Sequence, residues 1–315
     1  MINLILSAIK NSESGDLLQE YDGSILTGYS GTKLVASLQR LTNLWKGTDD
    51  ACYLEVGVFQ GLTLLSVAAA NPRLPCFGID NFAFFDPEGK NQGLVIERRA
   101  KLKADNASII NLDYEDALES LATHISDRKV AVYFVDGPHD YRSQLICLEL
   151  ALPYLRDDAV IIIDDCNYND VRQANRDFLV THPEFALVFE AYTPCHPSNM
   201  NEQQLTEARS GWWNGVNILA RDPGHTVERS YPPTERNRLL FENDRIIHSA
   251  KIAPHAVLAL RVASALDRYD LLGFGKALFR LWKEIGVTRS NSRDLFSSMN
   301  TFTSDLPKSR YGRLL

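Results

Sequence analysis

The feature that most constrains the fold is the alternation of short apolar runs with segments of helical periodicity. We predict seven strands, at Cys52–Val56, Cys76–Ile79, Ser108–Leu112, Val130–Val135, Ala159–Ile163, Phe185–Phe189 and Val216–Ala220. Helical patterns lie between them, near residues 61–70, 91–104, 114–124, 142–155 and 169–180. The fourth and fifth runs are apolar on both alternations, as strands buried on both faces of a parallel sheet are. The pattern predicts an α/β fold with a doubly wound, mostly parallel, seven-stranded sheet.

The segments that flank the alternating region read as helical. Residues 31–46 place apolar side chains at helical spacing, so residues 1–50 are expected to form an N-terminal helical segment. The strand pattern then continues through a main domain at 51–222. After Tyr231-Pro232-Pro233 only helical patterns remain, at about 236–250, 255–268 and 271–285, and the polar last twenty-odd residues are expected to be loose. Residues 223–315 are therefore predicted to be a helical C-terminal appendage.

The charge is distributed unevenly along the chain. The net charge is −7, yet residues 221–315 carry 16 Lys and Arg against 10 Asp and Glu. The remaining part is therefore strongly acidic, which disfavours nucleic acid as the main partner. The basic C-terminal part is more simply a solvated helical face than a site for an anionic partner.

Hydropathy and cysteine usage indicate a protein of the reducing cytoplasm. No apolar run reaches the roughly 20 residues that a membrane-spanning helix needs, and no membrane partner is expected. The apolar first six residues lack the features of a secretory signal. The five cysteines are Cys52, Cys76, Cys147, Cys166 and Cys195, and no pair has C-x-x-C spacing. Neither a disulfide framework nor a zinc site is indicated.

The first predicted strand runs into a glycine-containing turn. Its sequence is Glu55-Val56-Gly57-Val58-Phe59-Gln60-Gly61-Leu62-Thr63. Two glycines four residues apart allow a tight turn from strand to helix and a close approach of backbone to a ligand. The turn is not the dinucleotide pattern G-x-G-x-x-G, because Val58 and Phe59 occupy its middle. A plain glycine turn of another α/β protein is the alternative interpretation.

The second and third predicted strands each end in an acid. Asp80 follows the second strand, where a carboxylate can accept the two hydroxyls of a ribose. Asp113 follows the third strand and is placed to meet an adenine amino group. Each acid taken alone could equally be a helix N-cap.

Three aspartates follow the fourth and fifth predicted strands. Asp136 ends the fourth, and the pair Asp164-Asp165 ends the fifth. Carboxylates converging from adjacent strands repel one another unless a cation lies between them. Oxygen ligands favour a hard ion such as Mg²⁺, Ca²⁺ or Mn²⁺. His139 lies three residues after Asp136; taken alone it would be a turn or capping residue.

The order of these motifs resembles that of a known enzyme family. The stretch from Glu55 to Thr63 resembles motif I of class I methyltransferases. The continuation through Phe134-Val135-Asp136-Gly137-Pro138-His139 to Ile162-Ile163-Asp164-Asp165 looks like the metal-dependent O-methyltransferases of the macrocin and mycinamicin type. It is more distantly similar to catechol O-methyltransferase. The resemblance covers roughly residues 51–190, and it departs from the family at Arg156-Asp157-Asp158, where members usually carry a Gly-Gly turn.

The resemblance implies a reaction and a set of site residues. The reaction is methyl transfer from S-adenosylmethionine to a hydroxyl of a sugar or natural-product small molecule, assisted by a divalent metal, with Mg²⁺ favoured. Asp136, Asp164 and Asp165 match the metal-binding positions, and His139 matches the general base. The implied cofactor-binding residues are Glu55, Gly57, Gly61, Thr63, Asp80, Asp113 and Asp136.

Two other functions stay open from the sequence. One is an adenine-dinucleotide oxidoreductase, which the missing third glycine disfavours. The other is a noncatalytic cofactor-binding or scaffold protein that uses the basic helical part. A homo-oligomer is compatible with either function. Trp212-Trp213-Asn214, beside the last predicted strand, would line an acceptor pocket or belong to the core.

Overall fold

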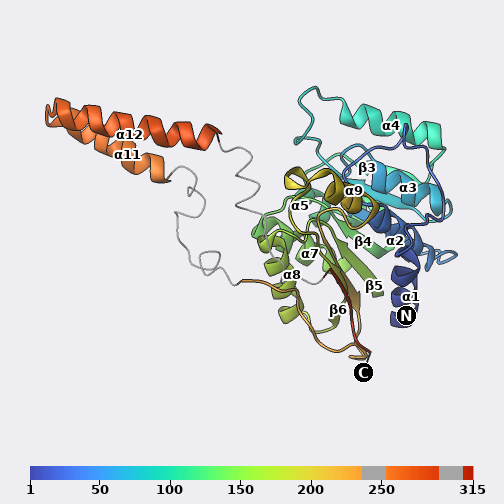
Figure 1. Cartoon of the computed structure of the whole chain (residues 1–315). Coiled ribbons are helices and arrows are strands. Elements are labelled where there is room, and N and C mark those ends of the chain that lie inside the picture. The colour runs from blue at the N-terminus through green and yellow to red at the C-terminus, as the bar shows by residue number, and fades with distance from the viewer. Residues whose placement is uncertain (236–252, 291–307, 315) are drawn as a thin grey trace. The chain divides into compact units, whose positions relative to one another are not determined.

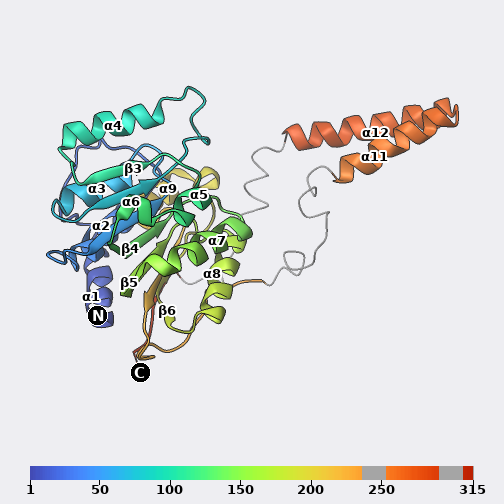
Figure 2. The same cartoon turned by 180° about the vertical axis from the view of Figure 1, so that it is seen from behind.

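The computed structural model describes residues 1–235, 253–290 and 308–314. The chain divides into two compact units, Met1–Thr234 with Asn300–Leu315, and Glu235–Met299. Figures 1 and 2 show the described helices and strands from opposite sides. None of the described helices combines the length and the apolar character needed to cross a membrane.

The first unit holds a sheet with helices on both faces. Its strands are β1 (Ala51–Val56), β2 (Cys76–Ile79), β3 (Ala107–Ile110), β4 (Lys129–Val135), β5 (Leu155–Ile163), β6 (Phe185–Ala191), β7 (Val216–Arg221) and β8 (Ser309–Tyr311). Its α-helices are α1 (Ile2–Ser12), α2 (Thr32–Asn43), α3 (Leu62–Ala70), α4 (Asn91–Leu102), α5 (Tyr114–Glu119), α6 (Ala122–Ile125), α7 (Tyr141–Ala151), α8 (Asn169–Thr181) and α9 (Glu202–Ser210). Two 3-10 helices, η1 (Leu152–Tyr154) and η2 (Pro197–Asn199), complete it.

The sheet has the strand order β3-β2-β1-β4-β5-β7-β6-β8. Strands β1 to β5 pair in parallel, whereas β7 runs antiparallel between β5 and β6. The seven expected strands all form, which confirms the doubly wound, mostly parallel α/β fold. The expected helix at 114–124 is divided into two short helices, α5 and α6.

Alternating side chains of the strands divide the core between the two faces of the sheet. In β1, Ala51 and Tyr53 pack with α1, α2 and α3, whereas Cys52, Leu54 and Val56 pack with α5 to α8. All five cysteines are buried and free. Figure 1 shows α1, α2 and α3 on one side of the strands and α7 and α8 on the other.

The expectation of a purely helical C-terminal appendage is wrong at its end, and the sheet has an eighth strand. Residues Ser309–Tyr311 pair antiparallel with β6 instead of being loose. Arg310 lies 2.6 Å from the Glu190 carboxylate, whose side chain is 1% exposed. A buried carboxylate is costly without a partner, so this ion pair stabilises the pairing of the polar segment with β6. The expected boundaries at residues 50 and 222 stay predictions.

The second unit contains a helical hairpin, α11 (Ala253–Asp267) and α12 (Leu271–Ser290). Both helices were expected from the sequence. The helix expected at 236–250 lies outside the described residues.

Candidate functional site

The candidate site lies where the strand order reverses, at the carboxyl ends of β1 and β4. The chain runs outward from β1 to β3 and returns through β4 to β5. Ligands of open α/β sheets bind at such a switch point. The expected site residues follow the strands around this point, so the fold brings their backbone positions to one edge of the sheet.

Gly57 and Gly61 shape the turn that follows β1. Their φ values are +94° and +83°, a region that favours glycine. A Cβ atom at Gly57 would lie 1.8 Å from the backbone oxygen of Asp136. The end of β4 therefore approaches the turn so closely that only glycine fits. This contact places Gly57, in the turn expected to bind the cofactor, beside Asp136, the first residue expected to bind the metal.

Glu55 and Thr63 lie behind this turn and contact each other. Glu55 is fully buried, and its two carboxylate oxygens accept hydrogen bonds from the hydroxyls of Tyr53 (2.6 Å) and Thr63 (3.2 Å). Burial raises the pKa of Glu55 to about 8, although the two hydroxyl donors oppose the shift. The side chain therefore ties β1 to the first turn of α3.

Asp80 organises the turn from the end of β2. Its Oδ2 accepts the backbone N–H groups of Val58 (2.9 Å) and Phe59 (2.7 Å), and its Oδ1 accepts that of Phe82 (2.7 Å). A carboxylate has about four lone-pair positions, so further acceptor capacity remains for a ligand hydroxyl. At the end of β3, the exposed Asp113 caps α5 through Glu115 N–H.

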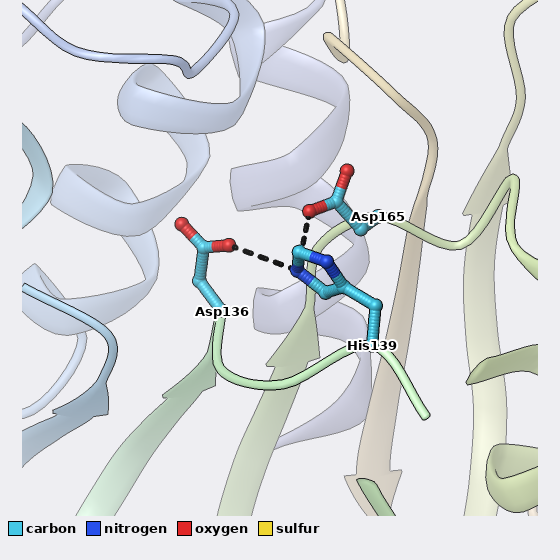
Figure 3. A group of neighbouring side chains, drawn as sticks. All are labelled: Asp136, His139 and Asp165. Carbon is cyan, nitrogen blue, oxygen red and sulfur yellow. Dashed lines mark ion pairs between the residues drawn. The ribbon is translucent and has the colours of Figure 1, made fainter. Parts of the chain in front are cut away.

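Asp136, His139 and Asp165 converge at the ends of β4 and β5 (Figure 3). The Nε2 atom of His139 lies 2.6 Å from Asp165 Oδ2 and 3.8 Å from Asp136 Oδ1. One ligand atom from each of the three residues lies within 4.8 Å of the others, the single such group among the described residues. The side chains are partly exposed, at 28% for Asp136, 32% for His139 and 13% for Asp165. A ligand can therefore reach them.

The electrostatics of these three groups are linked. Burial, reinforced by the nearby Asp165, raises the pKa of Asp136 to about 6. Burial alone would lower the pKa of His139, but Asp165 and Asp136 outweigh it and raise that pKa well above its usual value. Burial would likewise raise the pKa of Asp165, but the His139 charge and the Asn214 amide lower it. Without another cation, the imidazolium supplies the positive charge between the carboxylates.

Asp164 is oriented differently from Asp165. It is 2% exposed, and its Oδ1 accepts the backbone N–H of Asp165 at 2.8 Å. Burial and the neighbouring Asp136 and Asp165 raise its pKa well above the usual value. The structure thus brings two of the three expected metal residues together with His139, whereas Asp164 is not part of that group.

Tyr168 and Tyr29 were not singled out from the sequence, whereas Trp213 and Asn214 belong to the stretch that was expected to line a pocket or the core. Tyr168 stacks on His139 with ring centroids 5.2 Å apart, and Asn214 donates its amide to Asp165 Oδ1 at 2.5 Å. Tyr29 stacks on Phe59 at 5.5 Å and on Trp213 at 6.0 Å. Trp213 thus contacts an exposed aromatic group, whereas Trp212 is buried in the core. These contacts join segments that are far apart in the sequence, so no local sequence pattern predicts them.

The donor set fits a divalent cation. The two carboxylates are ligands that hard ions such as Mg²⁺ and Mn²⁺ use, whereas an imidazole is the ligand of softer ions. Nε2 of His139 is buried and, despite its ion-pair distance to Asp165, has no hydrogen-bond partner of acceptable geometry. The charge of the two carboxylates can therefore be balanced either by a protonated imidazole or by an ion that the carboxylates of Asp136 and Asp165 coordinate.

Comparison with known proteins agrees with this geometry. Residues 54–166 match the model of a family described as a methyltransferase domain. No curated protein matches the chain. Among solved structures, an O-methyltransferase from Bacillus cereus in complex with SAH is 12% identical, with a TM-score of 0.44, covering 70% of this chain and 91% of its own. TomG, an O-methyltransferase from Streptomyces achromogenes involved in tomaymycin synthesis, in complex with SAM, is 15% identical, with a TM-score of 0.43, covering 69% and 89%.

The family match spans β1 to the residues just after β5, and it includes the glycine turn and the acidic cluster. Residues 54–166 therefore match a methyltransferase domain, and the motifs in this stretch are those by which the sequence resembles the class I, S-adenosylmethionine-dependent enzymes.

Proposed function

We propose that the protein methylates a hydroxyl group of a small molecule, a sugar or a natural product, with the help of a divalent cation such as Mg²⁺. The observation that carries the proposal is the convergence of Asp136, His139 and Asp165 beside the glycine turn. The turn supplies a place for the methyl donor, and the cluster supplies ligands and a proton acceptor for a hydroxyl.

The methyl donor is proposed to bind along the ends of β1 to β4. Gly57 and Gly61 let the backbone approach the ligand, while Glu55 and Thr63 hold the turn from behind. Asp80 would accept a ribose hydroxyl with the lone-pair position that its three backbone hydrogen bonds leave. Asp113 would accept a hydrogen bond from the adenine amino group, and Asp136 would lie at the border between donor and acceptor.

Asp136 and Asp165 are proposed to hold the cation. Asn214 already donates to one oxygen of Asp165, which leaves the other oxygen, Oδ2, facing His139. Asp164, expected from the sequence as a third ligand, acts here by fixing the backbone of Asp165. When bound, the cation would polarise the acceptor hydroxyl and offset the carboxylate charges that raise the pKa of His139.

His139 is proposed to accept the hydroxyl proton at Nε2 as the acceptor oxygen attacks the methyl carbon. A bond from oxygen to carbon forms, the bond from carbon to the sulfonium sulfur breaks, and the electron pair of that bond leaves sulfur neutral. Tyr168 holds the imidazole plane by stacking. Placing donor and acceptor in line would supply much of the rate enhancement.

Ligand binding tests the proposal without knowledge of the acceptor. Calorimetry should show micromolar-range binding of S-adenosylhomocysteine, and NAD should not raise the melting temperature. Asp165→Asn should lose Mn²⁺ binding yet keep S-adenosylhomocysteine binding; Asp177→Asn, in α8, is the matched control. A wild-type protein that binds no S-adenosylhomocysteine would refute the proposal. Equal Mn²⁺ affinity in wild type and Asp165→Asn would refute the cation assignment alone.

A further inference from the structure

The hairpin of α11 and α12 exposes an apolar surface of its own. Ala265 and Ala277, each 8% exposed, are its two buried residues among the described side chains. The described side chains of these two helices therefore form no self-sufficient core, although most helical stability comes from packing of an apolar face. Another surface should therefore cover part of this hairpin.

The apolar surface lies mainly on α12. Its exposed apolar residues are Leu271 (79%), Leu272 (80%), Leu278 (45%), Phe279 (62%) and Trp282 (70%). At 3.6 residues per turn, these five side chains occupy a sector of about 120° around the helix axis. The rings of Phe279 and Trp282 lie 6.1 Å apart, so the two largest side chains form one patch.

Three cations border this apolar sector along one side. Lys276, Arg280 and Lys283 are exposed and fall within about the next 80° of the helix circumference. Their aliphatic stems can lie along apolar surface while the charged ends reach outward. An apolar sector containing Trp and Phe, edged by Lys and Arg, is the pattern of a helix that lies in a membrane interface.

We propose that α12 docks on the surface of a bilayer containing anionic phospholipids. The aromatic patch would enter the boundary between headgroups and acyl chains, and the cationic border would contact the phosphates. Antiparallel pairing of two copies about a two-fold axis would instead bring the same cationic border of each copy together, which is repulsive. The chain as a whole has a net charge of −7, so nonspecific attraction to an anionic surface is not expected.

This proposal departs from the sequence-based expectation of no membrane partner. That expectation depended on the absence of a run long enough to span a bilayer. A helix that lies in the interface needs no such run, because only one of its faces contacts lipid.

Vesicle co-sedimentation of the full-length protein tests the proposal. We expect binding to vesicles of phosphatidylcholine mixed with phosphatidylglycerol, weak binding to phosphatidylcholine alone, and weaker binding at high salt. The triple variant Lys276→Ala, Arg280→Ala and Lys283→Ala should bind roughly 100-fold more weakly, at about fivefold per lost cation. Phe279→Ser combined with Trp282→Ser should bind at least about tenfold more weakly.

A charge-matched control separates this surface from the effect of net charge. Lys90→Ala, Lys101→Ala and Arg313→Ala remove three exposed cations from the other unit and should leave vesicle binding unchanged. Absence of binding to the mixed vesicles, or equal loss in this control, would overturn the proposal. A wild-type dimer that Phe279→Ser with Trp282→Ser converts to monomer, without vesicle binding, would assign the surface to a second copy. S-adenosylhomocysteine binding should be unchanged in every variant, so the result is independent of the proposed function.

Discussion

Replacing Glu55 by glutamine should make the stability of the protein less dependent on pH between pH 6 and pH 8. Glu55 is fully buried, and burial raises its pKa to about 8 from an ordinary value of 4.5. The folded protein therefore keeps a proton that the unfolded chain releases. A carboxyl group whose pKa is raised on folding contributes stability that is present below its unfolded pKa and is lost as pH rises through its folded pKa.

The size of this change in stability follows from the shift in the pKa of Glu55. Each pH unit between the two pKa values costs about 1.4 kcal/mol, so Glu55 should remove about 2 kcal/mol of stability between pH 6 and pH 8. Glutamine stays neutral and nearly isosteric, and it keeps an oxygen that can accept the hydroxyl of Tyr53 or Thr63. Between pH 6 and pH 8, the free energy of unfolding of Glu55→Gln should therefore fall by about 2 kcal/mol less than that of the wild type.

Urea unfolding at pH 6 and pH 8, followed by tryptophan fluorescence, measures the difference. Comparing variant with wild type cancels the titration of other groups, including His139 and Asp136. Glu207→Gln, on an exposed helical face, is the matched control and should unfold with the wild-type pH dependence. Identical pH dependence in Glu55→Gln and wild type would refute the conclusion that the buried carboxyl is neutral.

Four further outcomes are expected. Asp80→Ala should weaken S-adenosylhomocysteine binding by about 1–3 kcal/mol in calorimetry, because a ribose hydroxyl and backbone amides lose their acceptor; unchanged affinity would exclude the ribose assignment. His139→Ala should keep S-adenosylhomocysteine and Mn²⁺ binding but lower kcat by roughly 10²–10⁴, and full activity across pH 6–9 would make the imidazole structural. Exhaustive chelation should abolish turnover and Mg²⁺ should restore it, whereas activity that survives chelation contradicts a metal role. Arg310→Ala should reduce the free energy of unfolding by about 1–3 kcal/mol because Glu190 loses its cation, while Arg313→Ala, at an 83% exposed side chain, should have little effect.

The sheet could be predicted because its strands carry their signal locally. The runs at 130–135 and 159–163 are apolar on both faces, and only strands buried on both sides require that. The edge strand β8 could not be predicted in this way. It is a three-residue polar segment, held by Arg310 and by pairing with a strand more than a hundred residues earlier.

The sequence placed Asp136, His139 and Asp165 in one candidate site, and geometry brings them together. It could not show which way the Asp164-Asp165 pair turns. Consecutive side chains at a strand end point to opposite sides, so both carboxylates rarely reach one site. Asp165 has a φ of +56°, a backbone conformation that the amino-acid sequence does not reveal.

Helix α9 was not predicted, although its sequence carries a local signal. Asn201 and Gln204 form a capping box at its start.

The return of the chain to β8 makes the hairpin unit an insertion and not a tail. Deleting everything after Thr234 would remove the hairpin and, with it, the outermost strand. Such a deletion would expose the hydrogen-bonding edge of β6, a template for aggregation, and strip Glu190 of its cation. Aggregation of that truncated protein would then report on the sheet edge. The role of the hairpin is tested by an internal deletion, in which a flexible linker joins Thr234 to Lys308 and the strand is kept.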